Sequence, residues 1–349
     1  MAINLAQKYH DKLVAALEYA SDLAGKTTDE FKIDGNEGIY LTSLEPQALN
    51  NYSKTGTSNR YGTPAEMQDT QQYIAWDYDK SYSITVDKAN YQDGGYLKTA
   101  GAVVEEQNNE VVAPFIEQNF YAKLFANPGK SITGSDPSSS TIMSRITAIE
   151  AAMKNARIPK ADRYLAIGTT MFQLIRHSLT NCDEVTDKLL LKGVVGKIGT
   201  LNVIEVADND LPAHVYMIAW QKKSALKAFD IKEAKVHRDP PGINGILVEY
   251  RVRGVNGVVG KRCGGVVVDV NTSYKQAAGS TTNAGVITVG ASSDYTLYTL
   301  DGSDPRYSKT AVKITSGTTP THTAGDVIKC VSYKAGKAPS DIWSVTTAS

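Results

Sequence analysis

An almost unbroken alternation of apolar and polar residues runs from Ile74 to Asp87. A period of two residues is typical of a β-strand with one buried face. At roughly 3.3 Å per residue this strand would extend over about 45 Å, well beyond the usual strand of about five or six residues. We therefore expect a neighbouring chain to cover part of its apolar face, which points to assembly. The alternative is a hairpin strand folded back on its own domain.

Periods of three and four residues predict helices. The first helix is amphipathic and spans 5–24, with Asn4 as its cap and Gly25 as its end. A long helical pattern then covers about 96–125. Its internal Pro114 predicts a kink, because proline removes a backbone donor and clashes with the preceding turn.

A third helix is expected after the serine run 138–140, which can cap it. Its apolar positions recur on one face and end before Pro159: Ile142, Ile146, Ile149 and Met153. This stripe is typical of a helix that packs against a core.

Short apolar runs between these helices predict strands at 38–44, 164–167, 201–206 and 215–220. Two further β-rich runs, 245–252 and 258–270, flank Val255-Asn256-Gly257. Asn-Gly is a strong hairpin signal, so we expect a turn there. Helices and strands in this mixed order predict an α+β domain.

The composition changes near residue 270. Glutamate occurs 14 times up to Glu249 and not once in the 79 residues after Val270, where serine and threonine fill 25 positions. Strand and turn residues replace helix formers, which predicts a small all-β sandwich over 281–349. Its expected strands are 286–289, 295–299, 312–314, 327–333 and 343–346, and we expect 271–280 to be a linker that few contacts cross.

Charge and cysteine content restrict the class of protein further. Lysine and arginine (37) balance aspartate and glutamate (37), so no strong global field attracts nucleic acid or an anionic membrane. Cys182, Cys263 and Cys330 are widely spaced and odd in number, which fits neither a disulfide framework nor a CxxC metal site. We expect reduced, buried cysteines in an intracellular assembly compartment. The N-terminus resembles no secretory signal, and no run approaches ~18 apolar residues.

Little in the sequence points to catalysis. The five histidines have no paired spacing, and neither a GxSxG elbow nor a phosphate loop occurs. The acidic pairs Asp77/Asp79 and Glu105/Glu106 are better explained as solvated faces than as catalytic dyads. We expect no catalytic, cofactor-binding or metal-binding residue, no cofactor and no enzymatic activity. A basic run could contact phosphates or a neighbour's carboxylates, although a solvated surface is the default: Lys222, Lys223, Lys227, Lys232, Lys235 and Arg238.

Five segments, taken in order, resemble a tailed-phage major capsid protein of the HK97 fold. They are the N-terminal helix, WDYDKSYSITVDKANYQDGG, VVAPFIEQNFYAKLF, NARIPKADRYLAIGTTMFQLIR, and KIGTLNVIEVADNDLPAHVYMIAW through GVVGKRCGG. The resemblance covers about residues 1–270. It implies an N-terminal arm over 1–33 and an HK97-like capsid core over 34–270, in which an extended loop spans about 50–93, a spine helix about 96–126 and an axial domain about 138–240.

The resemblance implies a structural protein that self-assembles into hexamers and pentamers of an icosahedral shell around double-stranded DNA. Implied partners are further copies of the chain, scaffold, portal and decoration proteins, and DNA bound without sequence specificity. The implied location is the virion, assembled in the bacterial host cytoplasm. A nanocompartment shell of the encapsulin type remains an alternative. Some shells of this family carry Lys–Asn cross-links; Lys80 and Lys88 lie in the loop region, but no partner can be identified and we do not predict cross-linking.

The tail carries a second resemblance. YTLYTLDGSDPRYSKTAVKI is similar to the C-terminal Ig-like module of chitobiases and β-hexosaminidases. We expect its DGSDP segment, 301–305, to form a tight turn between strands. A calcium site at Asp301 and Asp304 is the sharper alternative. The resemblance implies an outward-facing decoration domain that binds surface glycans weakly or buttresses the shell; the alternative function is a secreted or surface carbohydrate-binding protein.

Overall fold

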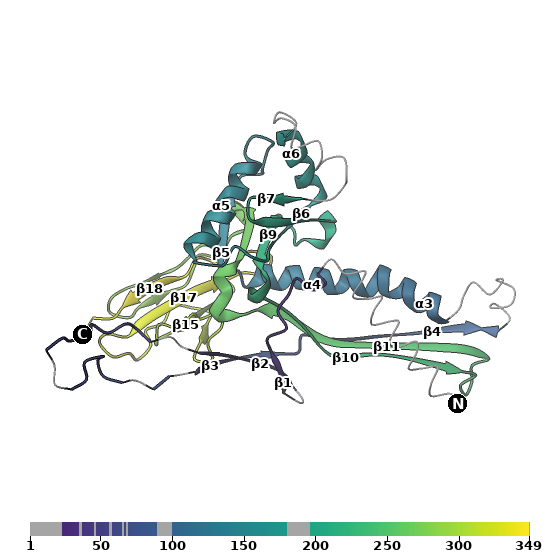
Figure 1. Cartoon of the computed structure of the whole chain (residues 1–349), viewed down its shortest axis with the longest axis horizontal. Coiled ribbons are helices and arrows are strands. Elements are labelled where there is room, and N and C mark those ends of the chain that lie inside the picture. The colour runs from purple at the N-terminus through teal and green to yellow at the C-terminus, as the bar shows by residue number, and fades with distance from the viewer. Residues whose placement is uncertain are drawn as a thin grey trace.

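The computed structural model describes residues 23–34, 37–44, 47–55, 58–64, 66–67, 69–88, 100–179 and 196–348. Figure 1 shows a lobe with two helices at the top, a long blade of strands beneath a helix on the right, and a C-terminal β-module on the left. The predicted helix at 5–24 lies almost entirely outside the described residues. The mixture of helices and separate sheets confirms the predicted α+β class for the body.

A six-stranded mixed sheet forms the centre of the lobe. β12 runs parallel to β5 and β6 runs parallel to β8, whereas the other neighbouring pairs are antiparallel. Most of its strands are apolar on both faces because both faces are covered. The strand order is β5 (Lys130–Gly134), β12 (Val266–Asn271), β9 (Val215–Gln221), β6 (Arg163–Gly168), β8 (Leu201–Val206) and β7 (Lys197–Ile198).

Two helices, α5 (Ile142–Asn155) and α6 (Thr169–Leu179), pack on one face of this sheet. The predicted stripe is confirmed, since Ile142, Ile146, Ile149 and Met153 are all fully buried or nearly so. The serine run does not supply the cap residue itself. Thr141 occupies the N-cap position, and Ser138 contributes its backbone carbonyl, which accepts from the amide of Ile142 at 2.9 Å.

The predicted long helix consists of three consecutive pieces within the described residues: α3 (Ala100–Gln107), a π-helical turn (Asn108–Val112) and α4 (Ala113–Ala126). Pro114 lies in the first turn of α4. Because proline lacks the amide that a regular α-helix uses there, the helix widens by one residue just before it. The helix ends at Asn127, as the sequence Asn127-Pro128-Gly129 predicts.

The blade is a three-stranded antiparallel sheet in the order β10 (Ala225–Arg238), β11 (Gly245–Val258) and β4 (Tyr78–Asp87). The long helix lies along one face of this sheet (Figure 1). Side chains from all three strands and from the helix form one apolar cluster, in which Val104, Ile116, Val248 and Tyr250 are buried. The apolar face of β4 is therefore covered largely by residues of the same chain. This agrees with the alternative of a strand folded back on its own domain.

A single strand from Ile74 to Asp87 is a wrong prediction. The chain leaves one sheet after β3 (Asp69–Ala75) and enters another at β4, with Trp76 and Asp77 between them. Lys123 donates to the Asp77 carboxylate at 2.6 Å and Asn119 donates to it at 2.8 Å. These α4 side chains hold the polar residue at the crossover, and alternation alone does not reveal a change of sheet.

The hairpin predicted at Val255-Asn256-Gly257 is also wrong. All three residues continue β11 in register with β10, and the actual connection of these strands is the segment 239–244. Asn256 is 2% exposed, and its side-chain amide donates to the Ile116 carbonyl at 3.3 Å and to Asn119 at 2.7 Å. Asn256 is therefore an interior residue of β11 that hydrogen-bonds to α4, although Asn-Gly in the sequence resembles a turn.

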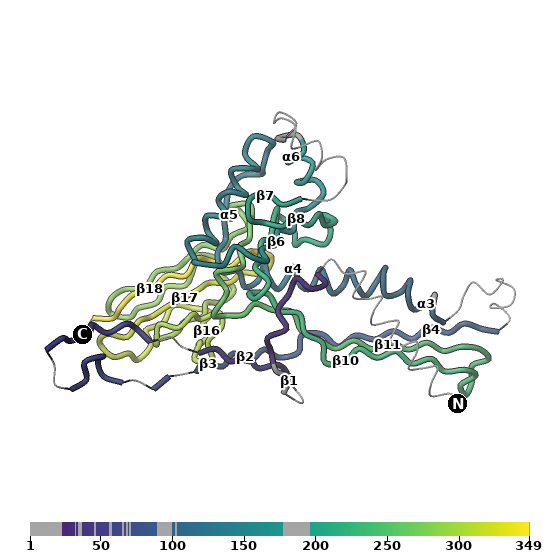
Figure 2. Tube along the Cα trace, in the orientation of Figure 1, coloured from purple at the N-terminus to yellow at the C-terminus, as the bar shows by residue number. Residues whose placement is uncertain are grey.

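A small antiparallel sheet, in the order β1 (Lys32–Asp34), β2 (Gly38–Leu44) and β3, lies beneath the body. Its apolar side packs on the bases of β10 and β11 through Ile39, Leu41, Leu226 and Val255. Figure 2 shows the chain between β2 and β3 running out toward the side on which the C-terminal module lies.

The C-terminal module contains a two-stranded ribbon, β13 (Ser280–Thr281) with β14 (Ile287–Thr288), and a four-stranded antiparallel sheet. Ile287 of the ribbon packs with Tyr298, Ile328 and Cys330 of the sheet. The strands predicted for this region are confirmed, four of them to the residue, in the sheet order β16 (Val312–Ile314), β15 (Tyr295–Thr299), β17 (Val327–Tyr333) and β18 (Trp343–Thr346).

The segment expected to be a free linker, 271–280, is packed instead. Tyr274 stacks on His214 of the lobe with ring centroids 3.5 Å apart. The amide of Gln276 donates to the Ala338 carbonyl at 2.9 Å, and that of Ala338 donates to the Tyr274 carbonyl at 2.8 Å. The linker prediction is wrong because a polar, glycine-containing composition does not distinguish a mobile connection from one that follows a surface.

Candidate functional site: the projecting loop and the module junction

The connection between β2 and β3 carries the most exposed large apolar side chains among the residues that the structure describes. Leu49 is fully exposed, Tyr61 is 83% exposed, and Tyr52 and Met67 are more than half exposed. Tyr52 and Tyr61 contact each other edge to face at 5.1 Å, so the two sides of the loop lie against each other. Apolar side chains gathered on a projection are typical of a surface that another protein covers.

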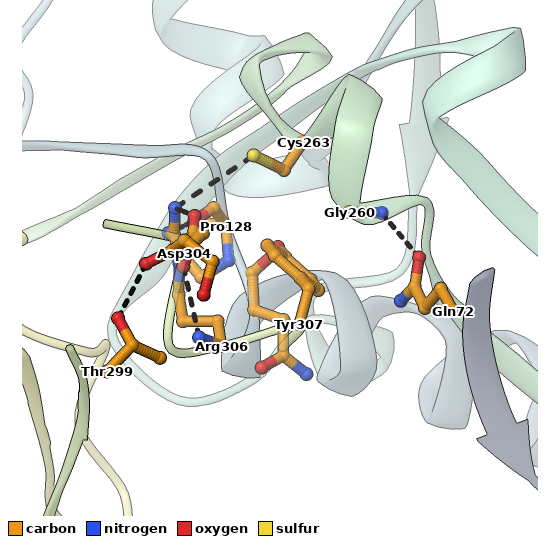
Figure 3. Close-up of polar contacts among 10 residues, drawn as sticks. Gln72, Pro128, Gly260, Cys263, Thr299, Asp304, Arg306 and Tyr307 are labelled. Carbon is orange, nitrogen blue, oxygen red and sulfur yellow. Dashed lines mark hydrogen bonds and ion pairs between the residues drawn. The ribbon is translucent and has the colours of Figure 1, made fainter. Parts of the chain in front are cut away.

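The C-terminal module contacts the body through the segment that follows its DGSDP turn (Figure 3). Asp304 and Arg306 form a bidentate pair, with Nη2 2.6 Å from Oδ2 and Nε 2.9 Å from Oδ1. The Arg306 side chain is only 6% exposed, and its other guanidinium nitrogen donates to the carbonyl of Pro128, just beyond the end of α4. An arginine neutralised by its own neighbour is thereby presented to a backbone acceptor of the body.

Tyr307 lies beside Arg306 in the same junction. Its hydroxyl donates to the Asn127 carbonyl at 2.7 Å, and burial raises the pKa of this hydroxyl well above its ordinary value, so it stays a neutral donor. The ring lies against Gly260, where a Cβ would come within 2.7 Å of the Tyr307 Cβ. Glycine at 260 therefore allows the close approach of the module.

The turn at 260–265 also contacts the sheet that carries the projecting loop. Gln72 of β3 accepts from the Gly260 amide at 2.7 Å and donates to the Val258 carbonyl at 3.1 Å. The ammonium group of Lys261 donates to the Leu44 carbonyl at the end of β2. The junction therefore brings together the module, the end of α4, and the base of the projecting hairpin.

The DGSDP segment forms a hydrogen-bonded turn within the module. Asp301 accepts from the amide of Ser303 at 3.0 Å and from the hydroxyl of Thr310 at 2.9 Å, and Gly302 has a positive φ of 71°. Asp304 is paired with Arg306. Among the described residues no group of three or more histidine, cysteine or carboxylate side chains is arranged to hold a metal ion.

The carboxylates of the two acidic pairs lie in ion pairs or on an exposed helix face. Asp77 pairs with Lys123, and Asp79 pairs with Arg251 at 2.6 Å on the blade. Glu105 and Glu106 are both exposed on α3. These carboxylates therefore contribute to surfaces and ion pairs and do not converge on a pocket.

The basic run is divided among ion pairs and aromatic contacts. Lys223 pairs with Glu30 at 2.7 Å and Lys235 with Glu233 at 3.2 Å, while Lys232 lies 4.5 Å from the ring centre of Phe229. These lysines point to several local partners, so the run does not form one phosphate-binding patch.

The remaining singled-out side chains also have local partners. Lys88 pairs with Asp239 at 2.8 Å, and Lys80 lies 5.9 Å from the ring centre of Phe115. Cys182 lies outside the described residues. Cys263 and Cys330 are free thiols, and burial raises the pKa of both.

The sequence patterns did not reveal two features, one in the module and one in the body. In the sequence, Arg306 and Tyr307 resemble ordinary loop residues. Only their position after the DGSDP turn indicated that they have a fixed place. Asp269 interrupts the apolar run of β12 and is fully buried, 3.4 Å from Arg145 of α5. A single acid within a valine-rich strand was the available signal.

No helix in the part of the chain that the structure describes is both long and apolar enough to cross a membrane. No protein-family model matches the sequence. No curated protein matches it either.

Comparison with solved structures gives a clear result for the fold. A chain of Mycobacterium phage Che8 aligns over 71% of this chain and 90% of its own length, with 20% identity and a TM-score of 0.54. A chain from the capsid of the cyanophage P-SCSP1u aligns over 69% of this chain and 85% of its own length, with 12% identity and a TM-score of 0.54. The protein has the fold of a phage capsid chain. A chain from the capsid of Ralstonia phage GP4 agrees, covering 70% of this chain and 85% of its own at 10% identity and a TM-score of 0.50.

The comparisons confirm the predicted capsid-like α+β fold of the body, whereas its division into arm, extended loop, spine helix and axial domain stays a prediction. At these identities the likeness concerns the fold. The likeness does not extend to naming the C-terminal module, whose strands the structure describes but whose relation to Ig-like modules it leaves as a prediction.

Proposed function

We propose that the chain is the major capsid protein of a tailed phage. Copies would assemble as hexamers and pentamers into an icosahedral shell that encloses double-stranded DNA, in the cytoplasm of a bacterial host, and would remain in the virion. The role is structural, without catalysis. The observation that carries the proposal is the capsid fold combined with a projecting loop whose apolar side chains, Leu49 and Tyr61 above all, are left exposed.

The near-zero net charge supports the same role. A strongly basic inner wall would hold a packaged genome through many phosphate contacts, whereas a balanced surface permits its release. Scaffold, portal and decoration proteins are the further partners we propose. An encapsulin-type shell differs in its cargo, and particles that enclose an enzyme without DNA would favour it.

We further propose that the C-terminal module is an Ig-like domain that faces outward from the shell. Its six strands in two small sheets and its DGSDP turn support this. A carbohydrate-binding function of this module is the weaker alternative, because Asp304 is committed to Arg306 and Asp301 to its own turn.

The proposal is tested with a loop variant. We expect the full-length chain to form closed shells or capsomer rings in negative-stain electron microscopy. Replacing Leu49 and Tyr61 together by aspartate should abolish them, because charged groups would have to be buried at the contact between copies. The control is Lys54→Asp in the same loop, which is also exposed but already polar. Particles of unchanged yield from the double variant would contradict assembly through this loop.

A further inference from the structure

We propose that the C-terminal module is an internal brace that fixes the direction of the projecting β2–β3 hairpin. The module would thus do more than decorate the surface. The consequence for shell formation rests on the proposed function, whereas the mechanical coupling between module and hairpin can be measured on the chain in any state of assembly.

The module is anchored on the body at a defined point. Arg306 and Tyr307 donate to two consecutive carbonyls, those of Pro128 and Asn127, which follow the last turn of α4. Helix ends leave such carbonyls without intrahelical partners, so they are available acceptors. Arg306 also lies near Cys263, with Nη2 3.9 Å from the sulfur, which ties the same side chain to the 260–265 turn.

The anchoring segment of the module contacts the hairpin through one intermediate residue, Gly260. Tyr307 packs on Gly260, and the amide of Gly260 donates to Gln72 of β3. A second route runs from the module to β2, because the Lys309 ammonium lies 5.7 Å from the ring centre of Tyr40. Figure 3 shows the route through Tyr307, Gly260 and Gln72. Both strands of the hairpin therefore meet the module, β2 directly and β3 through the turn.

The β2–β3 hairpin needs contacts beyond its own small sheet to fix its direction. A sheet of three short strands is stable only if its apolar face packs on something, and here the packing is limited to a small cluster at its base around Ile39 and Leu41. The loop beyond Leu44 is exposed. Beyond that cluster, the hairpin is held at Gln72 and Leu44 by the 260–265 turn, against which Tyr307 packs, and at Tyr40 by Lys309 of the module.

Two variants test the brace from opposite sides. Gly260→Ala places a Cβ 2.7 Å from the Tyr307 Cβ and 3.2 Å from the Gln72 side-chain oxygen, so it forces the module and the turn apart while every residue of the module stays the same. Tyr307→Phe removes only the hydroxyl that donates to Asn127. Tyr295→Phe is the matched control, since this tyrosine stacks on Tyr333 inside the module.

The readout is hydrogen exchange by mass spectrometry on full-length chains in the same state of assembly. For Gly260→Ala we expect exchange in β3 to accelerate about tenfold, with a smaller acceleration for Tyr307→Phe and none for the control. Peptides from β15 and β17 should keep wild-type protection, which shows that the module remains folded. Unchanged exchange in β3 in both junction variants would overturn the brace.

Shell formation is scored separately in the same samples. If wild-type chain forms particles, the brace predicts that Gly260→Ala lowers their yield at least several-fold while the control does not. If the wild type forms none, the proposed shell function fails, and the exchange result still decides whether the module braces the hairpin.

Discussion

Asp269 is a fully buried carboxylate in the middle of β12, and its setting makes a prediction about pH. Arg145 lies 3.4 Å away, but neither carboxylate oxygen has a hydrogen-bond partner among the described residues. Burial raises the pKa of Asp269 to about 7, and the attraction of Arg145 opposes this only in part. The folded protein therefore holds this proton more tightly than the unfolded chain does.

The sign of the pH dependence follows. Below pH 4 both states are protonated and the native state suffers no penalty from this group. Between about pH 4 and 7 the unfolded chain ionises first, so the free energy of unfolding falls as pH rises, by a total on the order of 4 kcal/mol, before levelling off above pH 7. Urea unfolding followed by tryptophan fluorescence, to which the fully buried Trp220 contributes, should show this slope.

The variant that isolates the effect is Asp269→Asn, which cannot ionise and should remove most of the slope between pH 4 and 7. The control is Asp239→Asn on the surface, where the contact with Lys88 lowers the pKa of the aspartate and any effect falls at more acidic pH. An Asp269→Asn protein with the wild-type slope would show that Asp269 is not the titrating group.

Single residues also show where sequence reasoning succeeds and fails. The stripe from Ile142 to Met153 was predictable because every member faces one core, and period alone determines which residues are buried. The role of Asn256 was not, because its two partners lie on α4, about 140 positions earlier in the chain. Arg306 and Tyr307 were missed for the same reason: their acceptors are backbone carbonyls, which leave no signature in side-chain composition.

At the scale of elements, the crossover between β3 and β4 gives a second prediction. Asp77 accepts from Lys123 and from Asn119, and Asn119 in turn accepts from Asn256. We expect Asp77→Ala to destabilise the folded chain by about 1 kcal/mol, because the hydrogen bonds to a partly exposed carboxylate are lost. Thermal or chemical unfolding measures this change.

The matched control for Asp77→Ala is Asp79→Ala. Asp79 pairs bidentately with Arg251, but both side chains are well exposed, so the substitution should change stability by less than about 0.5 kcal/mol. Equal losses for the two variants would mean that the crossover contact has no special role in joining strand to helix.

The elements were predictable to different degrees. In the module, short strands separated by glycine, serine and proline turns coincide with 295–299 and 327–333 because each strand is bounded by its own turn signals. The 74–87 alternation failed because a strand that crosses between two sheets keeps its period. Neither the sheet order of the lobe nor the packed course of 271–280 is encoded in local pattern, since both depend on contacts between distant segments.

At the scale of the whole molecule, the module and the body form one packed unit. Lys130 of β5 pairs with Asp341 of the module at 3.7 Å, Lys275 of the connecting segment pairs with the same carboxylate at 2.6 Å, and Ala338 belongs to the apolar cluster of the lobe. A chain truncated after Asn271 should therefore lose more than decoration. We expect a lower unfolding midpoint than that of the full-length chain, measured by scanning calorimetry, because the apolar cluster of the lobe loses Ala338 and Tyr307.

A truncated chain with the full-length midpoint would show that the module is only tethered to the body. The appropriate control is an exposed position just after β16, Thr315→Ala, which takes no part in the contacts named above between the module and the body. It should leave the midpoint almost unchanged, as exposed substitutions of this kind do.

The most direct test of the account is the mass of the purified full-length chain in solution. Light scattering on a sample freed of aggregates should give a species many times the 37.7 kDa of one chain, with a discrete mass that matches rings or closed shells. A monodisperse 37.7 kDa monomer at every concentration and salt condition tried would contradict the proposal that this chain builds a shell.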